Sequence, residues 1–131
     1  MRMKTLFAVV ASLLLVACSN PFAPDEPWKA GAVAYQSPTL EVLWNKIEAC
    51  SGLKGDLTAV RFYVTPARFK VSAEGGALPA AGVWVPDENA IYLARAYSQI
   101  DGLIMHEEMH ALLHRVDHPM SYFSGVCGPL M

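Results

Sequence analysis

The sequence predicts an α+β domain in which a small antiparallel sheet packs against two helices. Apolar residues recur at helical spacing in residues 38–50 and again in about 99–115. Between these segments they alternate with polar residues, which indicates strands. The chain of 131 residues is long enough for one such domain with a modest core.

The first predicted helix, residues 38–50, follows a favourable start signal. Ser37 can cap the helix, and Pro38 suits the first helical position because a backbone N–H there has no partner within the helix. Gly52 then favours termination. The apolar residues at helical spacing are Leu40, Leu43, Trp44 and Ile47. We expect this face to pack on the core.

A strand and a hairpin are predicted next. Residues 60–65 alternate between apolar and polar side chains, which indicates a half-buried strand that ends at Pro66. Residues 75–81 begin with two glycines and are expected to form a loop. Residues 82–85 and 90–94 predict two short strands around a turn, and hence a hairpin.

The second predicted helix, about residues 99–115, contains three of the four histidines of the chain, and the fourth follows it closely. Ser98 with Asp101 is the expected N-terminal cap. Pro119 disfavours helical geometry at His118, so the helix should end before that residue.

His106, Glu107 and His110 form a metal-binding pattern. Residues i and i+4 lie on one face of a helix, so the two imidazoles can bind one ion. Glu107 lies beside that face, where it can accept a proton from water. We therefore expect Zn²⁺ bound by His106 and His110, with Glu107 as the catalytic general base. Glu108 is expected to be a solvated charge.

Three residues are candidates for the third zinc ligand: His114, Asp117 and His118. His114 continues the row of histidines, but on a straight helix it lies about 12 Å in rise from His106. Three imidazoles spread so widely cannot easily converge on one tetrahedral ion. A turn at residues 115–117 would instead return His118 to the site. The sequence favours His118 and leaves His114 and Asp117 open.

The first residues resemble the signal peptide and lipobox of bacterial lipoproteins. A basic start precedes an apolar run at residues 6–16 that is too short to span a bilayer, and Cys18 follows a small residue. The resemblance implies cleavage of residues 1–17, lipid attachment at Cys18 and a lipid-anchored tether over residues 18–36. Because Ser19 rather than aspartate follows the cysteine, we expect the periplasmic side of the outer membrane.

Charge and cysteine content narrow the expected partners and bonds. The net charge of −2 becomes more negative without the basic signal peptide, and no basic run remains, so nucleic acid is not expected as a partner. Cys50 and Cys127 remain after lipidation and can form a disulfide in an oxidising compartment. Two free thiols, or Cys127 as a zinc ligand, are the alternatives.

Residues 60–127 resemble the zincin metallopeptidases, in which a small sheet lies beside the helix that carries the motif. The resemblance implies that residues 82–85 form an edge strand that pairs with an extended peptide substrate. His118 and Phe123 also resemble the His-Gly-x-x-Phe segment of SprT-like zincins, with Pro119 in place of the glycine.

The expected function is that of a zinc-dependent hydrolase, a peptidase of the bacterial cell envelope with a zincin-like domain over residues 37–131. Its expected partners are a peptide or protein substrate and the membrane, which it reaches through the N-terminal lipid. Tyr92, Tyr97 or Tyr122 could stabilise charge on the substrate carbonyl. The alternatives are a metal-binding lipoprotein without catalysis, in which Glu107 is dispensable, and an inactive zincin scaffold.

Overall fold

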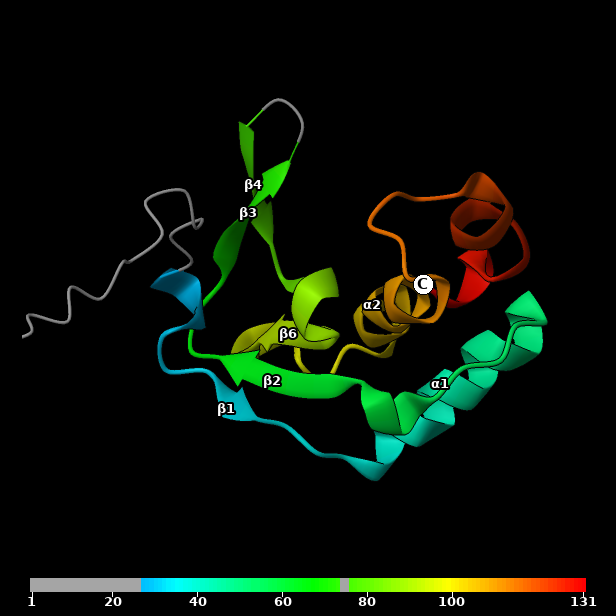
Figure 1. The fold of residues 1–131 in the computed structure, drawn as a ribbon, viewed down its shortest axis with the longest axis horizontal. Coiled ribbons are helices and arrows are strands. Elements are labelled where there is room, and N and C mark those ends of the chain that lie inside the picture. The colour runs from blue at the N-terminus through cyan, green and yellow to red at the C-terminus, as the bar shows by residue number, and fades with distance from the viewer. Residues whose placement is uncertain (1–26, 74–75) are drawn as a thin grey trace, which may run out of the picture.

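A four-stranded sheet lies beside two α-helices in this computed structural model, which describes residues 27–73 and 76–131 (Figure 1). A two-stranded hairpin extends away from the sheet, and the C-terminal segment lies next to the helices. The predicted α+β class is thus confirmed. The expected signal peptide and the lipid attachment residue Cys18 lie outside the described residues.

The two helices form close to where the sequence predicts them. α1 spans Pro38–Ser51, with Ser37 as N-cap and Gly52 as a left-handed C-cap. α2 spans Asp101–Leu113 and begins after Ile100 rather than at Ser98, whose hydroxyl donates to the Arg95 carbonyl instead. No helix of the described ranges combines the length and apolar character needed to cross a membrane.

The sheet has the strand order β1-β2-β6-β5. Its strands are β1 (Val33–Ala34), β2 (Arg61–Thr65), β6 (Ala90–Ala94) and β5 (Gly82–Val85). β5 and β6 form the predicted antiparallel hairpin. β2 pairs with β6 in parallel, however, so the sheet is mixed rather than antiparallel throughout. β5 does not pair with β2. Instead β6 lies between the two strands, antiparallel to β5 and parallel to β2.

The expected loop at residues 75–81 is wrong, because this segment contains a strand. β3 (Phe69–Ala73) and β4 (Gly76–Ala80) form a second antiparallel hairpin. The expectation of a loop rested on Gly75 and Gly76, and Pro79 within β4 also cannot donate a ladder hydrogen bond. In a two-stranded hairpin both strands are edges, and a position whose N–H would face outward accepts proline without loss.

Residues 27–36 pack on the domain, although the sequence analysis assigned them to the tether. Trp28 stacks on Phe69 with ring centroids 4.5 Å apart, and β1 pairs with β2. Tyr35 packs against the main core. The domain boundary expected at residue 37 is therefore too late, and the folded part includes residues 27–36.

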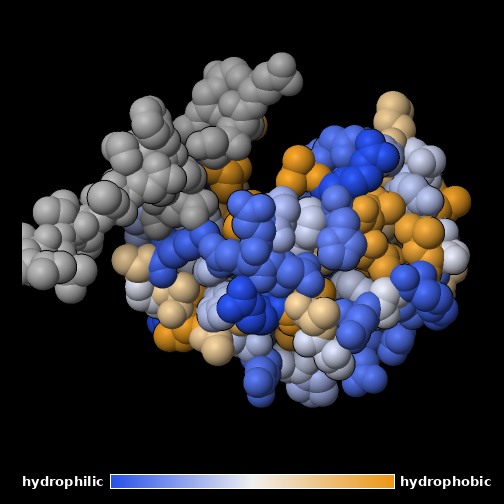
Figure 2. Space-filling view, viewed as in Figure 1, coloured by the Kyte–Doolittle hydropathy of each residue, from blue (hydrophilic) through white to orange (hydrophobic). Residues whose placement is uncertain are grey.

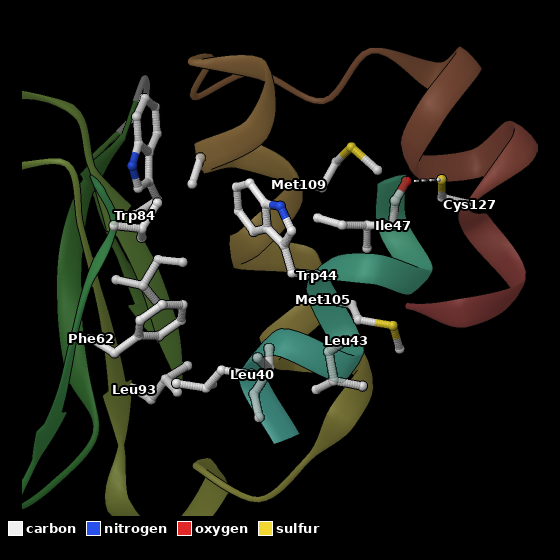
Figure 3. Packing of buried hydrophobic residues seen from close by; sticks show 14 residues of the cluster. Leu40, Leu43, Trp44, Ile47, Phe62, Trp84, Leu93, Met105, Met109 and Cys127 are labelled. Atoms are coloured by element: carbon white, nitrogen blue, oxygen red, sulfur yellow. Dashed lines mark hydrogen bonds between the residues drawn. The ribbon is translucent and has the colours of Figure 1, made fainter. Parts of the chain in front are cut away.

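The main core lies between one face of the sheet and the two helices (Figure 3). Trp44 and Ile47 of α1 face Met109 of α2 and side chains of the sheet. A disulfide joins Cys50 near the end of α1 to Cys127, with the Cα atoms 5.4 Å apart. It is the pair that the sequence analysis linked, and it ties the C-terminal segment to α1.

A second cluster covers the other face of the sheet. Phe69 of the β3–β4 hairpin and Tyr92 of β6 are its largest buried members. Glu88 accepts hydrogen bonds from the Tyr92 hydroxyl and the Lys29 ammonium, which fixes the Pro27–Lys29 turn over this cluster. The hairpin is therefore held at its base by packing against the sheet.

Candidate metal centre

Three histidine side chains converge beside the C-terminal half of α2. His106 and His110 lie one turn apart on α2, and His118 comes from the loop that follows it. The Nε2 atoms are 3.0 Å apart for His106 and His118, 3.2 Å for His110 and His118, and 3.3 Å for His106 and His110. These three residues could hold a metal ion.

The way α2 ends explains how His118 reaches the other two imidazoles. His114 follows the last helical residue and adopts a left-handed conformation, with φ 51° and ψ 43°. The N–H of His114 donates to the Ala111 carbonyl at 3.3 Å, and that of Arg115 donates to the His110 carbonyl at 3.2 Å. This bond pair is the Schellman motif, which ends a helix and redirects the chain.

The same turn orients the imidazole of His110. Its Nδ1 lies 2.7 Å from the backbone carbonyl of Arg115. Because a carbonyl oxygen can only accept, Nδ1 carries the proton, and Nε2 of the neutral ring presents its lone pair to the other histidines. A hydrogen bond of this kind fixes both the tautomer and the ring orientation of a metal ligand.

Burial keeps the helical histidines neutral. Burial, with smaller contributions from the neighbouring His110 and His118, lowers the pKa of His106 to about 4. Burial also lowers the pKa of His110, although the hydrogen bond to Arg115 opposes this shift. Both rings are therefore uncharged near pH 7, which is the form that binds metal ions.

Phe123 packs against all three imidazoles. Its ring centroid lies 4.9 Å from that of His106, 4.7 Å from His110 and 4.8 Å from His118. The residue belongs to a π-helical segment, η5 (Ser121–Val126), which directly precedes the disulfide-bonded Cys127. The disulfide therefore holds the segment whose aromatic ring supports the triad.

Glu107 lies in a tight position between α2 and β5. Its side chain is 5% exposed, and a Cβ on Gly82 would lie only 2.9 Å from the Glu107 Cγ and 3.0 Å from its Oε1. Burial raises the pKa of Glu107 to about 8, and a backbone hydrogen bond from Trp84 opposes the shift. Glycine at position 82 thus allows the carboxyl group to approach the edge strand.

Glu108 is fully buried, so the expectation of a solvated charge is wrong. Its exposure is 0%, and neither carboxyl oxygen has a hydrogen-bond partner among the described residues. Burial raises the pKa of Glu108 to about 9, because the charged form would lose its hydration. The sequence predicted an exposed residue because an amphipathic helix buries only one face. α2 is buried on several faces, and Glu108 lies on one of them.

A groove of about 1090 Å³ runs over the histidines and Glu107. One stretch of chain, from Leu78 to Pro86, lines it continuously and includes most of β4 and all of β5. Val116 and Asp117 of the loop after α2 line it as well. The β3–β4 hairpin and this loop stand apart at the top of the view in Figure 1.

Apolar side chains reach the surface around this region. Hydrophobic surface is visible over the C-terminal part of the molecule, on the right of Figure 2. Exposed apolar residues of that part include Val116, Met120 and Val126. On the hairpin, Leu78 is also exposed. Of these residues, Val116 and Leu78 line the groove, so part of its border is apolar.

The other candidates from the sequence lie away from the point where the imidazoles meet. His114 is exposed and turns its ring edge toward Trp84, with centroids 5.7 Å apart. Asp117 lines the groove, but its carboxylate accepts two hydrogen bonds from the Arg115 guanidinium, at 2.8 and 2.6 Å. The turn that the sequence placed at residues 115–117 begins at His114.

The expected tyrosine beside the site is not found within residues 27–73 and 76–131, since no tyrosine there lines the groove. Tyr92 lies in the second cluster and Tyr97 packs under the Arg68 guanidinium. Tyr122 packs against the main core. A role for these three tyrosines at the substrate carbonyl therefore has no support in the geometry.

Sequence reasoning missed three features of the site: the carbonyl of Arg115, the backbone of Trp84 and the close approach of Gly82. The first two are backbone groups, which carry no signal in the residue type. Gly82 did carry a signal, because an isolated glycine in a strand often marks a close approach of another group. It was interpreted only as the start of a strand.

Comparison of the chain with protein-family models, with curated proteins and with solved structures gave no match in any of the three.

Proposed function

We propose that this chain is a zinc-dependent peptidase of the bacterial cell envelope, anchored through a lipid on Cys18. The observation that carries the proposal is the convergence of three imidazole Nε2 atoms in a groove that Glu107 also lines. The anchor rests on the lipobox resemblance. The Cys50–Cys127 disulfide agrees with an oxidising compartment outside the cytoplasm.

The donor set fits zinc. In tetrahedral coordination with Zn–N bonds of about 2.0–2.1 Å, neighbouring nitrogen atoms are about 3.3 Å apart. The observed separations of 3.0 to 3.3 Å are close to this value. Three imidazoles would leave the fourth position for water or substrate, as in catalytic rather than structural zinc sites. His106, His110 and His118 would hold the ion.

Glu107 is the residue that would move protons. Bound zinc would supply Lewis acidity toward water and toward a carbonyl oxygen. Glu107 would accept the proton of the attacking water and then deliver it to the leaving amine. Its raised pKa suits this exchange, because a base that must also act as an acid works best near the ambient pH. Trp84 holds the carboxyl group through its backbone N–H.

An extended peptide is the substrate that the groove favours. β5 is an edge strand, and Ala81 already bonds to Ala94 of β6. In an antiparallel ladder the bonding residues alternate, so the backbone groups of Gly82 and Trp84 point away from β6. The N–H of Trp84 donates to Glu107, so the backbone of Gly82 and the carbonyl of Trp84 are the groups that can pair with an added strand. Lys70 on β3 and the apolar groove residues would then contact substrate side chains.

The decisive experiment measures metal content and peptide cleavage on the same protein. Purified wild type should contain one equivalent of zinc and should cleave members of a peptide library. Glu107→Gln should retain zinc. Its cleavage rate should fall by about 100- to 10,000-fold, because the group that accepts the proton is gone. Glu41→Gln, on the exposed side of α1, is the matched control.

The possible outcomes distinguish the mechanism, the catalytic role and the metal site. Cleavage by Glu107→Gln at the wild-type rate would exclude this mechanism. Zinc binding without cleavage by wild type would instead support a non-catalytic metal-binding lipoprotein. Absence of zinc from wild type that has been refolded with excess metal would exclude the site itself.

A second pair of variants tests the placement of Glu107. Gly82→Ala introduces a methyl group within 2.9 Å of the Glu107 side chain and should reduce cleavage while zinc content stays near one equivalent. Gly102→Ala is the matched control, since its new methyl group meets nothing closer than 3.4 Å. Equal cleavage by both variants would contradict the close placement of the base.

A further inference from the structure

We propose that His114 is a positioning residue whose left-handed backbone, rather than its imidazole, sets the metal affinity of the site. The inference rests on the proposed metal centre. It deepens that proposal by naming the backbone element that controls one of the ligands.

Many helices end in a left-handed residue, but glycine usually occupies that position, whereas here it is His114. Outside glycine, this conformation is disfavoured because Cβ approaches the following carbonyl, and β-branched residues are the least tolerant. Among residues other than glycine in the described ranges, only Asn89 and His114 have positive φ. Asparagine and histidine are both enriched among the exceptions, and β-branched residues are not. The conformation at His114 has a clear structural consequence.

That consequence is the position of the next carbonyl. With residue 114 left-handed, the backbone of Arg115 returns to the last turn of α2 and makes two contacts with His110. Its N–H donates to the His110 carbonyl at 3.2 Å, and its carbonyl accepts from the His110 Nδ1–H at 2.7 Å. One backbone unit thus ends the helix and orients a metal ligand.

The ring of His114 lies elsewhere. It is exposed and packs against Trp84 in a T-shaped arrangement, while the converging Nε2 atoms belong to His106, His110 and His118. If only the backbone matters, residues that accept the left-handed conformation should replace His114 without loss. Residues that disfavour the left-handed conformation should displace the Arg115 carbonyl. The His110 ring would then lose the hydrogen bond that fixes its tautomer.

The test compares zinc dissociation constants for variants at position 114 in the full protein. His114→Gly and His114→Asn should bind within about threefold of wild type. His114→Val should bind about 10- to 100-fold more weakly, which is the usual effect of losing an outer hydrogen bond to a ligating histidine. His114→Ala should fall between these groups and replaces the valine variant if that protein fails to fold.

Gly52→Val provides the matched control. Gly52 is the left-handed C-cap of α1, with φ 73°, and a Cβ there meets no atom within 4 Å. Valine at this position imposes the same kind of backbone strain at the end of the other helix, which carries none of the three histidines. It should lower the melting temperature and leave the zinc dissociation constant unchanged.

A second readout does not require metal. Long-range ¹H–¹⁵N spectra of the metal-free protein report which nitrogen of His110 carries the proton. Wild type and His114→Gly should show the Nδ1–H form, whereas His114→Val should show a mixture. If no variant binds zinc but the tautomers follow this pattern, the metal proposal fails and the positioning role stands. Equal loss of zinc by glycine, asparagine and valine, or no loss with valine, would overturn the inference.

Discussion

The two α-helices end in the same left-handed conformation but reach it with different residues. α1 is preceded by Ser37, whose hydroxyl accepts from the Thr39 N–H, and is followed by Gly52, which adopts positive φ without steric conflict. α2 begins after Ile100, whose side chain cannot accept a hydrogen bond, and ends at His114. α1 follows local preference at both ends, and α2 follows it at neither.

The buried carboxyl groups of the two helices differ in the same way. Glu48 of α1 accepts from the Trp44 Nε1, from the Gly55 N–H and from the Lys54 ammonium, at 3.1, 3.0 and 2.8 Å. Glu108 of α2 has no such partner among the described residues. Departures from local preference thus concentrate in the helix that carries the histidines. Such concentration is typical of functional sites.

The largest expected effect is the loss of metal binding from α2. His106→Ala and His110→Ala should each abolish tight binding of zinc, because two remaining ligands hold the ion weakly. His118→Ala should weaken it strongly. Isothermal titration calorimetry with zinc measures these effects, and His114→Asn serves as the control that removes an imidazole without loss. Wild-type affinity in His118→Ala would show that the loop does not supply the third ligand.

The next effect concerns the bond that connects α1 to the segment after α2. Cys50 and Cys127 are 77 residues apart, and removing a crosslink of this length should lower the free energy of unfolding by about 4 kcal/mol. Chemical denaturation of the wild type and of the Cys50→Ala, Cys127→Ala double variant provides the measurement. Peptide mapping without reduction should recover the two cysteines linked. Free alkylation of both in the native protein would show that the bridge is absent.

The buried carboxyl groups should give opposite dependences of stability on pH. Hydrogen bonds from Lys54 and Gly55 lower the pKa of Glu48, so its contribution is present above about pH 4.5 and is lost as the pH falls. Burial raises the pKa of Glu108 to about 9, so the folded state binds a proton that the unfolded state releases above about pH 4.5. Its contribution therefore declines as the pH rises from about 4.5 to 9.

Two glutamine variants separate these contributions. Glu48→Gln should lower the melting temperature at pH 7 by several degrees, because it removes the negative charge that pairs with Lys54. Glu108→Gln should leave a flatter dependence of stability on pH between 5 and 9 than wild type. Thermal unfolding in the presence of a metal chelator measures both. Parallel pH curves for wild type and Glu108→Gln would contradict the raised pKa.

The smallest expected effects are at the helix starts. Ser37→Ala should destabilise the protein by about 1 kcal/mol, since the Thr39 N–H loses its acceptor. Ile100→Asp should stabilise it by about 0.5–1 kcal/mol, because α2 gains an acceptor and a favourable charge at its N-terminus. Urea denaturation resolves differences of this size. Equal responses at the two positions would show that the ends of α1 and α2 do not differ as described.

Much of the secondary structure was predictable because the signals are local. The spacing of apolar residues in 38–50 and the start signal at Ser37 depend only on near neighbours, and α1 forms there. The β5–β6 hairpin is joined by a short turn and formed as expected. The β3–β4 hairpin was not predicted, because Gly75, Gly76 and Pro79 weaken the strand signal around β4.

The sequence by itself determined which chemical groups are available and which of them share a helix face. The spacing of His106, Glu107 and His110 places two imidazoles and a carboxyl group on one turn of helix through the geometry of the backbone alone. Only the tertiary structure decided that His118, rather than His114 or Asp117, completes the triad. That choice depends on where the chain turns and on Phe123, which packs against the imidazoles from a separate segment. Contacts between segments that are distant in the chain produce no local pattern in the sequence. The third histidine therefore became known only from the packing of the folded chain.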